Sequence, residues 1–298
     1  MTQHIHPESL KNLPQAVVSQ ITSLMQADGF SGHFSAQQYQ TLLATSNMTD
    51  TEFKLALLPI AATRAYCGIS HFHVGAIAEG HSGNVYFGAN IEIPGVQLNQ
   101  TVHAEQSAIS HAWMKGETGI KNITINHTPC GHCRQFMNEL NQVDELSIQL
   151  PNRPSYSLAD LLPESFGPKD LDIEARLMDS TRQNYRFDNA TSTIVNAIEA
   201  LNLSHAPYTH NHSGVALQTQ SGGLYSGAYA ENAAFNPSLP PLQVAINLLL
   251  LAGEKLEHIT TAVLAENANG SISHLAETQT TLEAINPDIT LEYLSLSQ

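Results

Sequence analysis

Apolar residues near the N-terminus recur with the spacing of an α-helix. Four of them fall at positions i, i+4, i+7 and i+8 of one segment, namely Val17, Ile21, Leu24 and Met25. Pro14 precedes this segment and Gly29 follows it, as is typical of the start and the end of an amphipathic helix. A second short helix is predicted over residues 36–43. We therefore expect residues 1–48 to form a small helical unit.

Residues 49–150 alternate between the helical and the strand pattern. The predicted elements are, in chain order, a helix from Glu52 toward Tyr66 that Pro59 kinks or breaks, strands over 73–78 and 85–92 joined by a turn at 80–83, a helix that begins at or just before His103 and runs through Met114, a strand over 123–126, a helix that begins at Cys130, and a strand over 146–150. This order, α-β-β-α-β-α-β, is typical of a sheet covered by helices. The expected fold class is α/β, with an α/β/α sandwich.

Four prolines interrupt regular structure beyond this segment: Pro151, Pro154, Pro163 and Pro168. A structureless connection over 151–189 would be unusually long, so we expect it to be packed or functional. A further helix over 191–203 begins a second domain, which is predicted to span 190–298.

The second domain repeats the first at a shift of 139 residues. Nine identical pairs occur in a 22-residue window without a gap: His71 and His210, His73 and His212, Gly75 and Gly214, Ser82 and Ser221, Gly83 and Gly222, Tyr86 and Tyr225, Gly88 and Gly227, Ala89 and Ala228, and Glu92 and Glu231. After a two-residue gap, Pro240 falls opposite His103 and Leu242 opposite Glu105, and no cysteine occurs over 265–270. The sequence thus predicts two tandem α/β/α sandwich domains, of which the second keeps the scaffold and has lost the candidate site.

The chain is acidic, with 12 Lys and Arg against 27 Asp and Glu and a formal net charge of −15. A nucleic-acid backbone would be repelled, so we expect no nucleic-acid partner, although acidity of this kind also serves solubility alone. No apolar run approaches the roughly 20 residues of a membrane helix, so we expect no membrane partner. Three cysteines and an N-terminus without a basic or apolar leader pattern favour a reducing cytoplasm.

The candidate chemistry lies in residues 101–136, where H-A-E at 103–105 precedes P-C-G-H-C at 129–133. Two cysteines at CxxC spacing can bind one metal ion as thiolates, and a helix start lowers the thiol pKa of both. With His103 as the third ligand, sulfur and imidazole favour zinc. The open fourth position would hold a water whose pKa zinc lowers, and Glu105 would shuttle its proton.

Two other interpretations of this motif stay open. In a structural zinc site, a fourth protein ligand would close the coordination sphere, and the candidates for that ligand are Cys67, His111, His127 and His132. A redox dithiol would need neither His103 nor Glu105. The H-x-E element favours an open, catalytic site over both.

The two motifs resemble the H-x-E…P-C-x-x-C signature of the zinc-dependent cytidine deaminases, and the resemblance extends over nearly the whole chain. It is closest to the long-chain, homodimeric bacterial branch, in which segments similar to 100–113 and 230–237 recur. The resemblance implies one zinc ion per chain, bound by His103, Cys130 and Cys133. It also implies attack of hydroxide at C4 of the pyrimidine, while Glu105 carries a proton to N3 and assists the departure of ammonia.

Further residues match substrate-binding positions of that family: Phe72, Asn90, Glu92, Ala104 and Phe166. Phe72 would pack on the pyrimidine, Asn90 and Glu92 would hold the ribose 3′-hydroxyl, and the backbone near Ala104 would contact the base edge. Phe166 would reach the active site of the partner subunit in a homodimer. Because a carboxylate at position 92 suits a free hydroxyl and would repel a phosphate, the resemblance implies a nucleoside substrate.

Two positions depart from the family's pattern. His127 stands where relatives carry tyrosine, and His73 where they often carry asparagine or proline, so either can alter substrate affinity or pH dependence. The implied function is zinc-dependent hydrolytic deamination of cytidine and 2′-deoxycytidine in pyrimidine salvage. The alternatives are a non-catalytic, zinc-stabilised binding protein and a deaminase that edits polynucleotides.

Overall fold

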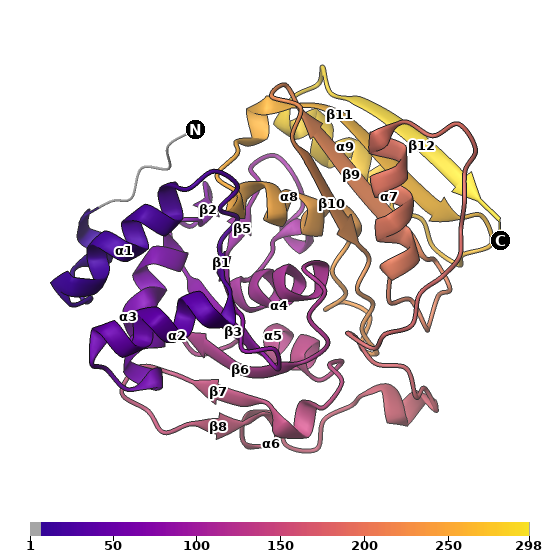
Figure 1. Cartoon of the computed structure of the whole chain (residues 1–298). Coiled ribbons are helices and arrows are strands. Elements are labelled where there is room, and N and C mark those ends of the chain that lie inside the picture. The colour runs from indigo at the N-terminus through magenta and orange to yellow at the C-terminus, as the bar shows by residue number, and fades with distance from the viewer. Residues whose placement is uncertain (1–6, 298) are drawn as a thin grey trace.

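The first half of the chain builds a six-stranded sheet with helices on both faces (Figure 1). The structure is a computed structural model and describes residues 7–297. Its elements up to the end of the proline-rich connection are η1 (Pro7–Leu10), α1 (Gln15–Gln26), β1 (His33–Phe34), α2 (Ala36–Ser46), α3 (Asp50–Ala62), β2 (Tyr66–Cys67), β3 (Gly75–Gly80), β4 (Val85–Ala89), β5 (Ile91–Glu92), η2 (Leu98–Gln100), α4 (Ala104–Met114), β6 (Ile120–Ile125), α5 (Gly131–Met137), η3 (Val143–Glu145), β7 (Ser147–Gln149), β8 (Tyr156–Ser157), α6 (Leu158–Leu161) and η4 (Pro168–Leu171). The strand order of this sheet is β1-β4-β3-β6-β7-β8.

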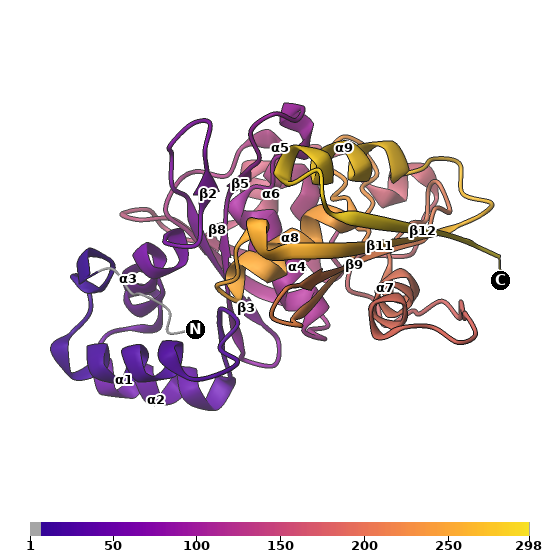
Figure 2. The same cartoon turned by 90° about the horizontal axis from the view of Figure 1, so that it is seen from above.

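The second half builds a four-stranded sheet in the order β10-β9-β11-β12. Its elements are α7 (Ser192–Leu203), β9 (Ser213–Thr219), β10 (Leu224–Ala228), α8 (Pro241–Leu251), η5 (Leu256–His258), β11 (Ile259–Asn267), α9 (Leu275–Ile285) and β12 (Thr290–Leu296). Figure 2 shows α7 and α9 on opposite faces of this sheet. None of the helices within residues 7–297 has the length and apolar character needed to cross a membrane.

The N-terminal helices lie close to their predicted positions. α1 covers the predicted apolar segment, and α2 ends at Ser46 rather than at residue 43. α2 and α3 each begin with a capping box, in which the residue before the helix and the third helical residue exchange hydrogen bonds. Pro59 lies inside α3 without ending it, and α3 stops at Ala62, short of Tyr66. It stops early because β2 pairs in parallel with β5 instead.

Helices approach both sheets closely at glycines. A Cβ atom on Gly75 would lie 2.6 Å from the Leu58 carbonyl oxygen in α3, and one on Gly88, which faces the other side of the sheet, would overlap the backbone of α4. In the second half, Gly214 makes the same approach to α7 and Gly227 to α8. Side chains at these positions would push the helices away from the sheets. Both halves are therefore α/β/α sandwiches, as predicted.

The register of the strands confirms the predicted repeat. Gly75 lies opposite Ala89 in the hairpin of the first copy. In the second copy, Gly214 and Ala228, which are their equivalents 139 residues later, lie opposite each other in the same way. His71 and His210 both have a φ of 57°, a left-handed backbone that is uncommon for residues with a Cβ atom. The two copies thus share their loop conformation as well as their strands.

The two copies pack against each other through α4 and α8, and one continuous apolar core includes residues of both. Ser107 Oγ in α4 donates to Asn247 Oδ1 in α8 over 2.5 Å, and Asn247 Nδ2 donates to the Ser107 carbonyl over 2.9 Å. Because these polar groups are buried, each needs the partner that the other copy supplies.

The proline-rich connection is packed, as predicted. Its strand β8 pairs antiparallel with β7, with Ser147 opposite Ser157. Further along, the Leu177 N–H donates to the Glu139 carbonyl over 3.0 Å. The division of the chain at residues 48, 150 and 189 stays a prediction.

His111 in α4 is a fully buried imidazole. Its Nδ1 lies 2.9 Å from the Phe87 carbonyl oxygen, and its Nε2 has no hydrogen-bond partner among the described residues. Burial lowers the pKa of His111 to about 3, because the charged ring would lose its water.

We predict that acid destabilises the protein through His111. The pKa of His111 is lower in the folded protein than the unfolded value of 6.5. The stability that the neutral ring provides is therefore fully present above pH 6.5. It is lost as the pH falls below 6.5, at about 1.4 kcal/mol per pH unit. In His111→Asn, whose amide can still donate to Phe87, the free energy of unfolding in urea should fall less between pH 7 and pH 5 than in the wild type. Equal decreases in the two proteins would contradict this prediction.

Candidate active site

Three metal-ligating atoms meet where α4 and α5 begin. His103 is the residue that immediately precedes α4, and Cys130 immediately precedes α5. His103 Nδ1 lies 3.4 Å from Cys130 Sγ and 3.2 Å from Cys133 Sγ, and the two sulfur atoms are 3.6 Å apart. The structure therefore brings the three predicted zinc ligands into one cluster.

The triangle of ligand atoms fits a zinc ion. In tetrahedral zinc sites with the usual bond lengths to sulfur and nitrogen, neighbouring ligand atoms stand about 3.6 to 3.8 Å apart. The edges of this triangle, 3.2 to 3.6 Å, are only slightly shorter. One imidazole nitrogen and two sulfurs also form a donor set that zinc prefers over the harder ions magnesium and calcium. Three such donors leave one tetrahedral corner without a ligand from this set.

The surroundings of the two cysteines shift the pKa values of their thiols in opposite directions. Hydrogen bonds with Cys133 and His103 lower the pKa of Cys130 to about 3, whereas the hydrogen bond between the two cysteines, together with burial, raises the pKa of Cys133. The hydrogen bond with Cys130 also raises the pKa of His103. The expectation that both cysteines act as thiolates concerns the zinc-bound site and stays a prediction. Metal binding releases the protons that the ligating thiols still carry.

Glu105 lies in the first turn of α4, next to the cluster. Its side chain is only 5% exposed, yet it forms part of a cavity wall. Burial raises the pKa of Glu105, since a carboxylate that loses its water is less stable as an anion. A carboxyl group whose pKa is moved toward neutrality can accept a proton and give it back.

A cavity of about 430 Å³ opens beside the cluster. This volume is typical of a site for a small molecule. The predicted site residues in its wall are Phe72, Asn90, Glu92, His103, Ala104, Glu105 and Cys130. Sequence reasoning did not find four others: Ser70, Val74, Thr101 and Thr128.

Glu92 is held in the cavity wall by several hydrogen bonds. Ser70 donates to it through its N–H over 2.8 Å and its hydroxyl over 2.6 Å, Ile69 N–H over 3.2 Å, and Asn90 Nδ2 over 3.3 Å. Burial acts to raise the pKa of Glu92, but the hydrogen bonds from Ser70, Ile69 and Asn90 outweigh it and lower the pKa. Glu92 is thus an anion. The sequence repeat could have indicated Ser70, because its equivalent in the second copy, Thr209, also carries a hydroxyl group.

Phe72 and His127 form an aromatic wall of the cavity. Their ring centres lie 4.6 Å apart, with the planes tilted by 42°. Asn90 fixes the loop that carries Phe72, because its Nδ2 donates to the Phe72 carbonyl over 2.9 Å and its Oδ1 accepts from Val74 N–H over 2.9 Å. The departure at His127 therefore lies at the cavity itself.

Phe166 lies outside this wall. Its ring, in the proline-rich connection, is 47% exposed. The Phe166 carbonyl accepts hydrogen bonds from Gln135 Nε2 over 2.7 Å and from Asn138 Nδ2 over 2.9 Å. The backbone of this exposed aromatic residue is therefore fixed to α5 and the residue that follows it.

Only one of the four candidates for a closing fourth ligand lies at the cluster. A ring nitrogen of His132 falls within 4.8 Å of the ligating atoms of His103 and Cys133. His132 Nε2 also lies 3.3 Å from the Asn236 carbonyl oxygen. His132 is not one of the residues that line the cavity beside the cluster. The other three candidates lie elsewhere: Cys67 in β2, His111 inside α4, and His127 beside Phe72.

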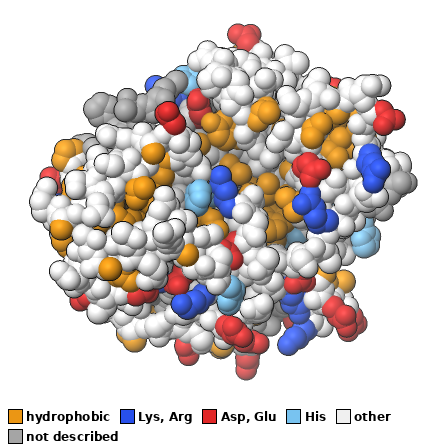
Figure 3. Space-filling model, viewed as in Figure 1, with side chains coloured by type: hydrophobic (Ala, Val, Ile, Leu, Met, Phe, Trp, Pro, Cys, Tyr) orange, Lys and Arg blue, Asp and Glu red, His pale blue; other side chains and the backbone are white. Residues whose placement is uncertain are grey.

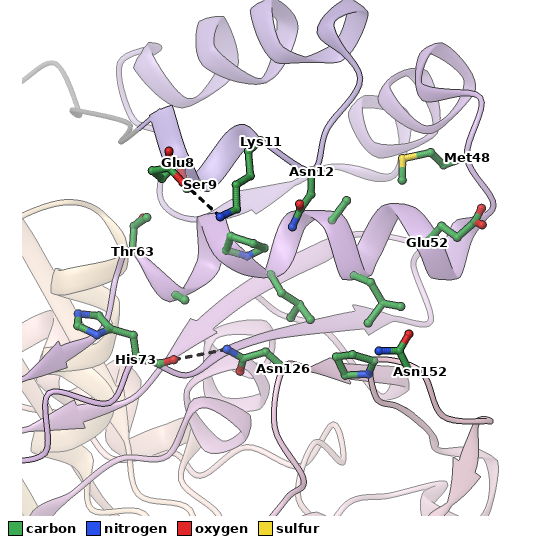
Figure 4. A pocket seen from close by; sticks show the side chains of 16 residues that line it. Glu8, Ser9, Lys11, Asn12, Met48, Glu52, Thr63, His73, Asn126 and Asn152 are labelled. Carbon is green, nitrogen blue, oxygen red and sulfur yellow. Dashed lines mark hydrogen bonds and ion pairs between the residues drawn. The ribbon is translucent and has the colours of Figure 1, made fainter.

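A larger cavity, of about 890 Å³, lies away from the cluster, beside η1 and α3 (Figure 4). Its wall includes apolar side chains of α3. Two other residues of the wall, Lys11 and Glu8, form a solvent-exposed ion pair over 3.2 Å. The side chain of His73 lines this cavity rather than the smaller one. The smaller cavity is the candidate site because it holds the ligand cluster and Glu105.

An α/β/α sandwich with imidazole and two thiols at two helix starts, and a carboxyl group beside them, defines the class of zinc-dependent deaminases. Residues 48–149 and residues 158–279 both match the family model described as the cytidine and deoxycytidylate deaminase zinc-binding region. The second match includes the copy that has lost the ligands.

The chain is 58% identical over 288 residues to a cytidine deaminase of Vibrio vulnificus strain YJ016, which covers 97% of this chain and 98% of that protein. It is 56% identical over 289 residues to a cytidine deaminase of Aliivibrio fischeri strain ATCC 700601 / ES114, which covers 97% of each chain. The crystal structure of cytidine deaminase from Mycobacterium tuberculosis matches at 32% identity and a TM-score of 0.36, over 40% of this chain and 99% of that one. The chain belongs to the cytidine deaminase family. The matched zinc-binding regions and the His and Cys cluster assign it a zinc cofactor.

We predict that Cys130→Ala loses zinc and keeps its fold, because the second copy keeps the same fold without these ligands. Metal analysis after dialysis should find about one zinc ion per chain in the wild type and a small fraction of that in the variant. Circular dichroism should show the same helix content in both. The matched control is Cys67→Ala, a buried cysteine outside the cluster, which should keep its zinc. Full zinc content in Cys130→Ala would contradict the ligand set.

Proposed function

We propose that the chain catalyses zinc-dependent hydrolytic deamination of cytidine and 2′-deoxycytidine to uridine and 2′-deoxyuridine, with release of ammonia, in cytoplasmic pyrimidine salvage. The observation that carries the proposal is the burial of Glu105 beside the His103, Cys130 and Cys133 cluster, in the wall of a cavity of about 430 Å³. The full-length relatives named cytidine deaminase support it.

The protein's own part in this reaction is proton transfer. Zinc held by His103, Cys130 and Cys133 would supply a Lewis acid that lowers the pKa of a water. Glu105 moves the protons of the attacking water: one ends on N3 of the pyrimidine and the other on the departing amine. A bond from oxygen to C4 forms and the bond from C4 to nitrogen breaks, so water and cytidine give uridine and ammonia.

The cavity wall supports a nucleoside as the substrate. Phe72 and His127 offer an aromatic surface for the pyrimidine, and Ala104 and Cys130, which line the same cavity, would contact the base edge through their backbone. The anion of Glu92, with Asn90 beside it, suits a ribose 3′-hydroxyl and would repel a phosphate at that position.

The partner subunit would be a second copy of the chain. The exposed ring of Phe166, on a backbone fixed to α5, supports the proposal that Phe166 reaches the active site of that copy. Closed symmetry would make the contact reciprocal.

Two alternatives are less well supported. A non-catalytic zinc protein has no use for a buried carboxyl group beside an open coordination corner. A polynucleotide substrate needs a basic surface, whereas the chain has a net charge of −15 and, on the face seen in Figure 3, its Lys and Arg side chains are scattered among Asp and Glu.

The direct test is the loss of cytidine absorbance on incubation with the purified chain. We predict steady conversion to uridine by the wild type, and a kcat lower by about 10²- to 10⁴-fold in Glu105→Ala, since general acid–base groups contribute on that order. Zinc content should stay at the wild-type level in the variant. No conversion by the zinc-loaded wild type would refute the function, and full activity of Glu105→Ala would refute the mechanism.

We predict that Glu92 and the 3′-hydroxyl act as one interaction. A hydrogen bond to a charged group contributes about 1.5 to 3 kcal/mol, so Glu92→Gln should lower kcat/KM for cytidine about 10- to 100-fold. Removing the hydroxyl, in 3′-deoxycytidine, should cost the wild type a similar factor. Because either change removes the same contact, the variant should barely distinguish the two substrates. Independent, multiplying losses would show that Glu92 binds elsewhere.

A further inference from the structure

One loop of the second copy contacts both helices that begin at the predicted zinc ligands. We call residues 232–237 the clamp loop. On the side of α4, Gln106 Nε2 donates to the Pro237 carbonyl of this loop over 3.1 Å, and Gln106 Oε1 accepts from the His103 N–H over 3.3 Å. One buried side chain thus joins the backbone of a predicted zinc ligand to the second copy.

A second glutamine makes the equivalent contact from the second copy to the first. Gln243, which is equivalent to Gln106 in the repeat, donates through Nε2 to the side chain of Gln100 in the first copy. The two equivalent glutamines thus make reciprocal contacts, as equivalent residues do across a symmetric dimer interface. The position of α4 relative to the clamp loop is therefore set by the interface as a whole.

On the side of α5, the contact is a buried carboxylate. Glu139 follows α5 closely and has no exposed surface. Its Oε2 accepts from the clamp-loop N–H of Ala233 over 2.9 Å, and its Oε1 accepts from His205 Nε2 over 2.9 Å and from the Tyr208 hydroxyl over 2.6 Å. All three donors belong to the second copy.

α5 needs such contacts because it is short. A seven-residue helix is not stable alone in water. Near its start, the Arg134 side chain donates to the Leu161 carbonyl in the connection over 2.7 Å, and beyond its end Glu139 binds the second copy. Both cysteines of the cluster lie at the start of α5, so a tilt of this helix would move both sulfur atoms relative to His103.

We infer that the second copy, which has lost its own site, holds α4 and α5 in place for the zinc site of the first, and that Glu139 is a positioning residue for the two cysteines. The inference rests on the proposed function for the identity of the zinc ligands. It gives the second copy a role in metal retention that its sequence, without ligands, does not show.

The test compares two buried carboxylates in the full chain, Glu139→Gln and Glu117→Gln. Glu117 accepts hydrogen bonds from Ser82 and from the Tyr86 hydroxyl, within the first copy. It lies beyond the far end of α4, about 16 Å of helix length from His103. Zinc release to a chromophoric chelator, well below the thermal midpoint of either variant, should be about 10-fold faster in Glu139→Gln, since loss of residues that orient ligands weakens metal sites on this order. In Glu117→Gln the thermal midpoint should fall while the rate of zinc release stays at the wild-type value.

A second variant keeps the test valid if Glu139→Gln does not fold. Asn232 Nδ2 donates to the Gln135 carbonyl in α5 over 2.9 Å, and Asn232 Oδ1 accepts from Ala234 N–H over 3.0 Å. Asn232→Asp replaces the donor to α5 with a buried carboxylate oxygen that repels the Gln135 carbonyl, so a folded Asn232→Asp should also release zinc faster than Glu117→Gln.

The possible results separate the inference from the function on which it rests. Zinc release at the same rate from both Glu139→Gln and Glu117→Gln, or a wild-type rate in a folded Asn232→Asp, would overturn the inference even if cytidine is deaminated. A wild type that binds zinc without converting cytidine would overturn the function, and faster zinc release from Glu139→Gln would still support the positioning role.

Discussion

The candidate site depends on holding three ligand atoms from two separate helices within 3.2 to 3.6 Å of one another. His103 precedes α4 and Cys130 precedes α5, so the two helix starts must meet at one edge of the sheet. Gly88 permits the close approach of α4 to the sheet, and the connection and the second copy fix α5 from two sides. The cavity then forms beside the cluster, with Glu105 inside it.

The repeat separates what the scaffold needs from what the chemistry needs. Glu231 in the second copy accepts from the N–H groups of Tyr208 and Thr209, as Glu92 does from Ile69 and Ser70. This arrangement of the loop is therefore part of the scaffold. The copies differ two residues earlier, where Tyr229 replaces Asn90, and Glu231 is almost fully buried. The carboxylate of the first copy, Glu92, lines the cavity beside the ligand cluster.

Much of the fold and the core of the candidate site could be predicted from the sequence because their determinants are local or repeated. Apolar spacing between Pro14 and Gly29 located α1, and identical residues 139 positions apart predicted that the second half repeats the scaffold of the first. Contacts between distant segments could not be predicted in this way. Nothing near Glu139 in the sequence indicates that His205 and Tyr208 bind it, and no pattern shows that His73 and His127 line different cavities.

X-ray absorption at the zinc edge separates an open catalytic site from a closed structural one, because it counts the ligands by element. For the zinc-loaded chain without substrate we expect two sulfurs, one imidazole and one light atom from solvent, and the same spectrum for His132→Ala. Two imidazoles in the wild type, one of which disappears in His132→Ala, would show that His132 closes the site. That result would contradict the open coordination corner on which the chemistry rests.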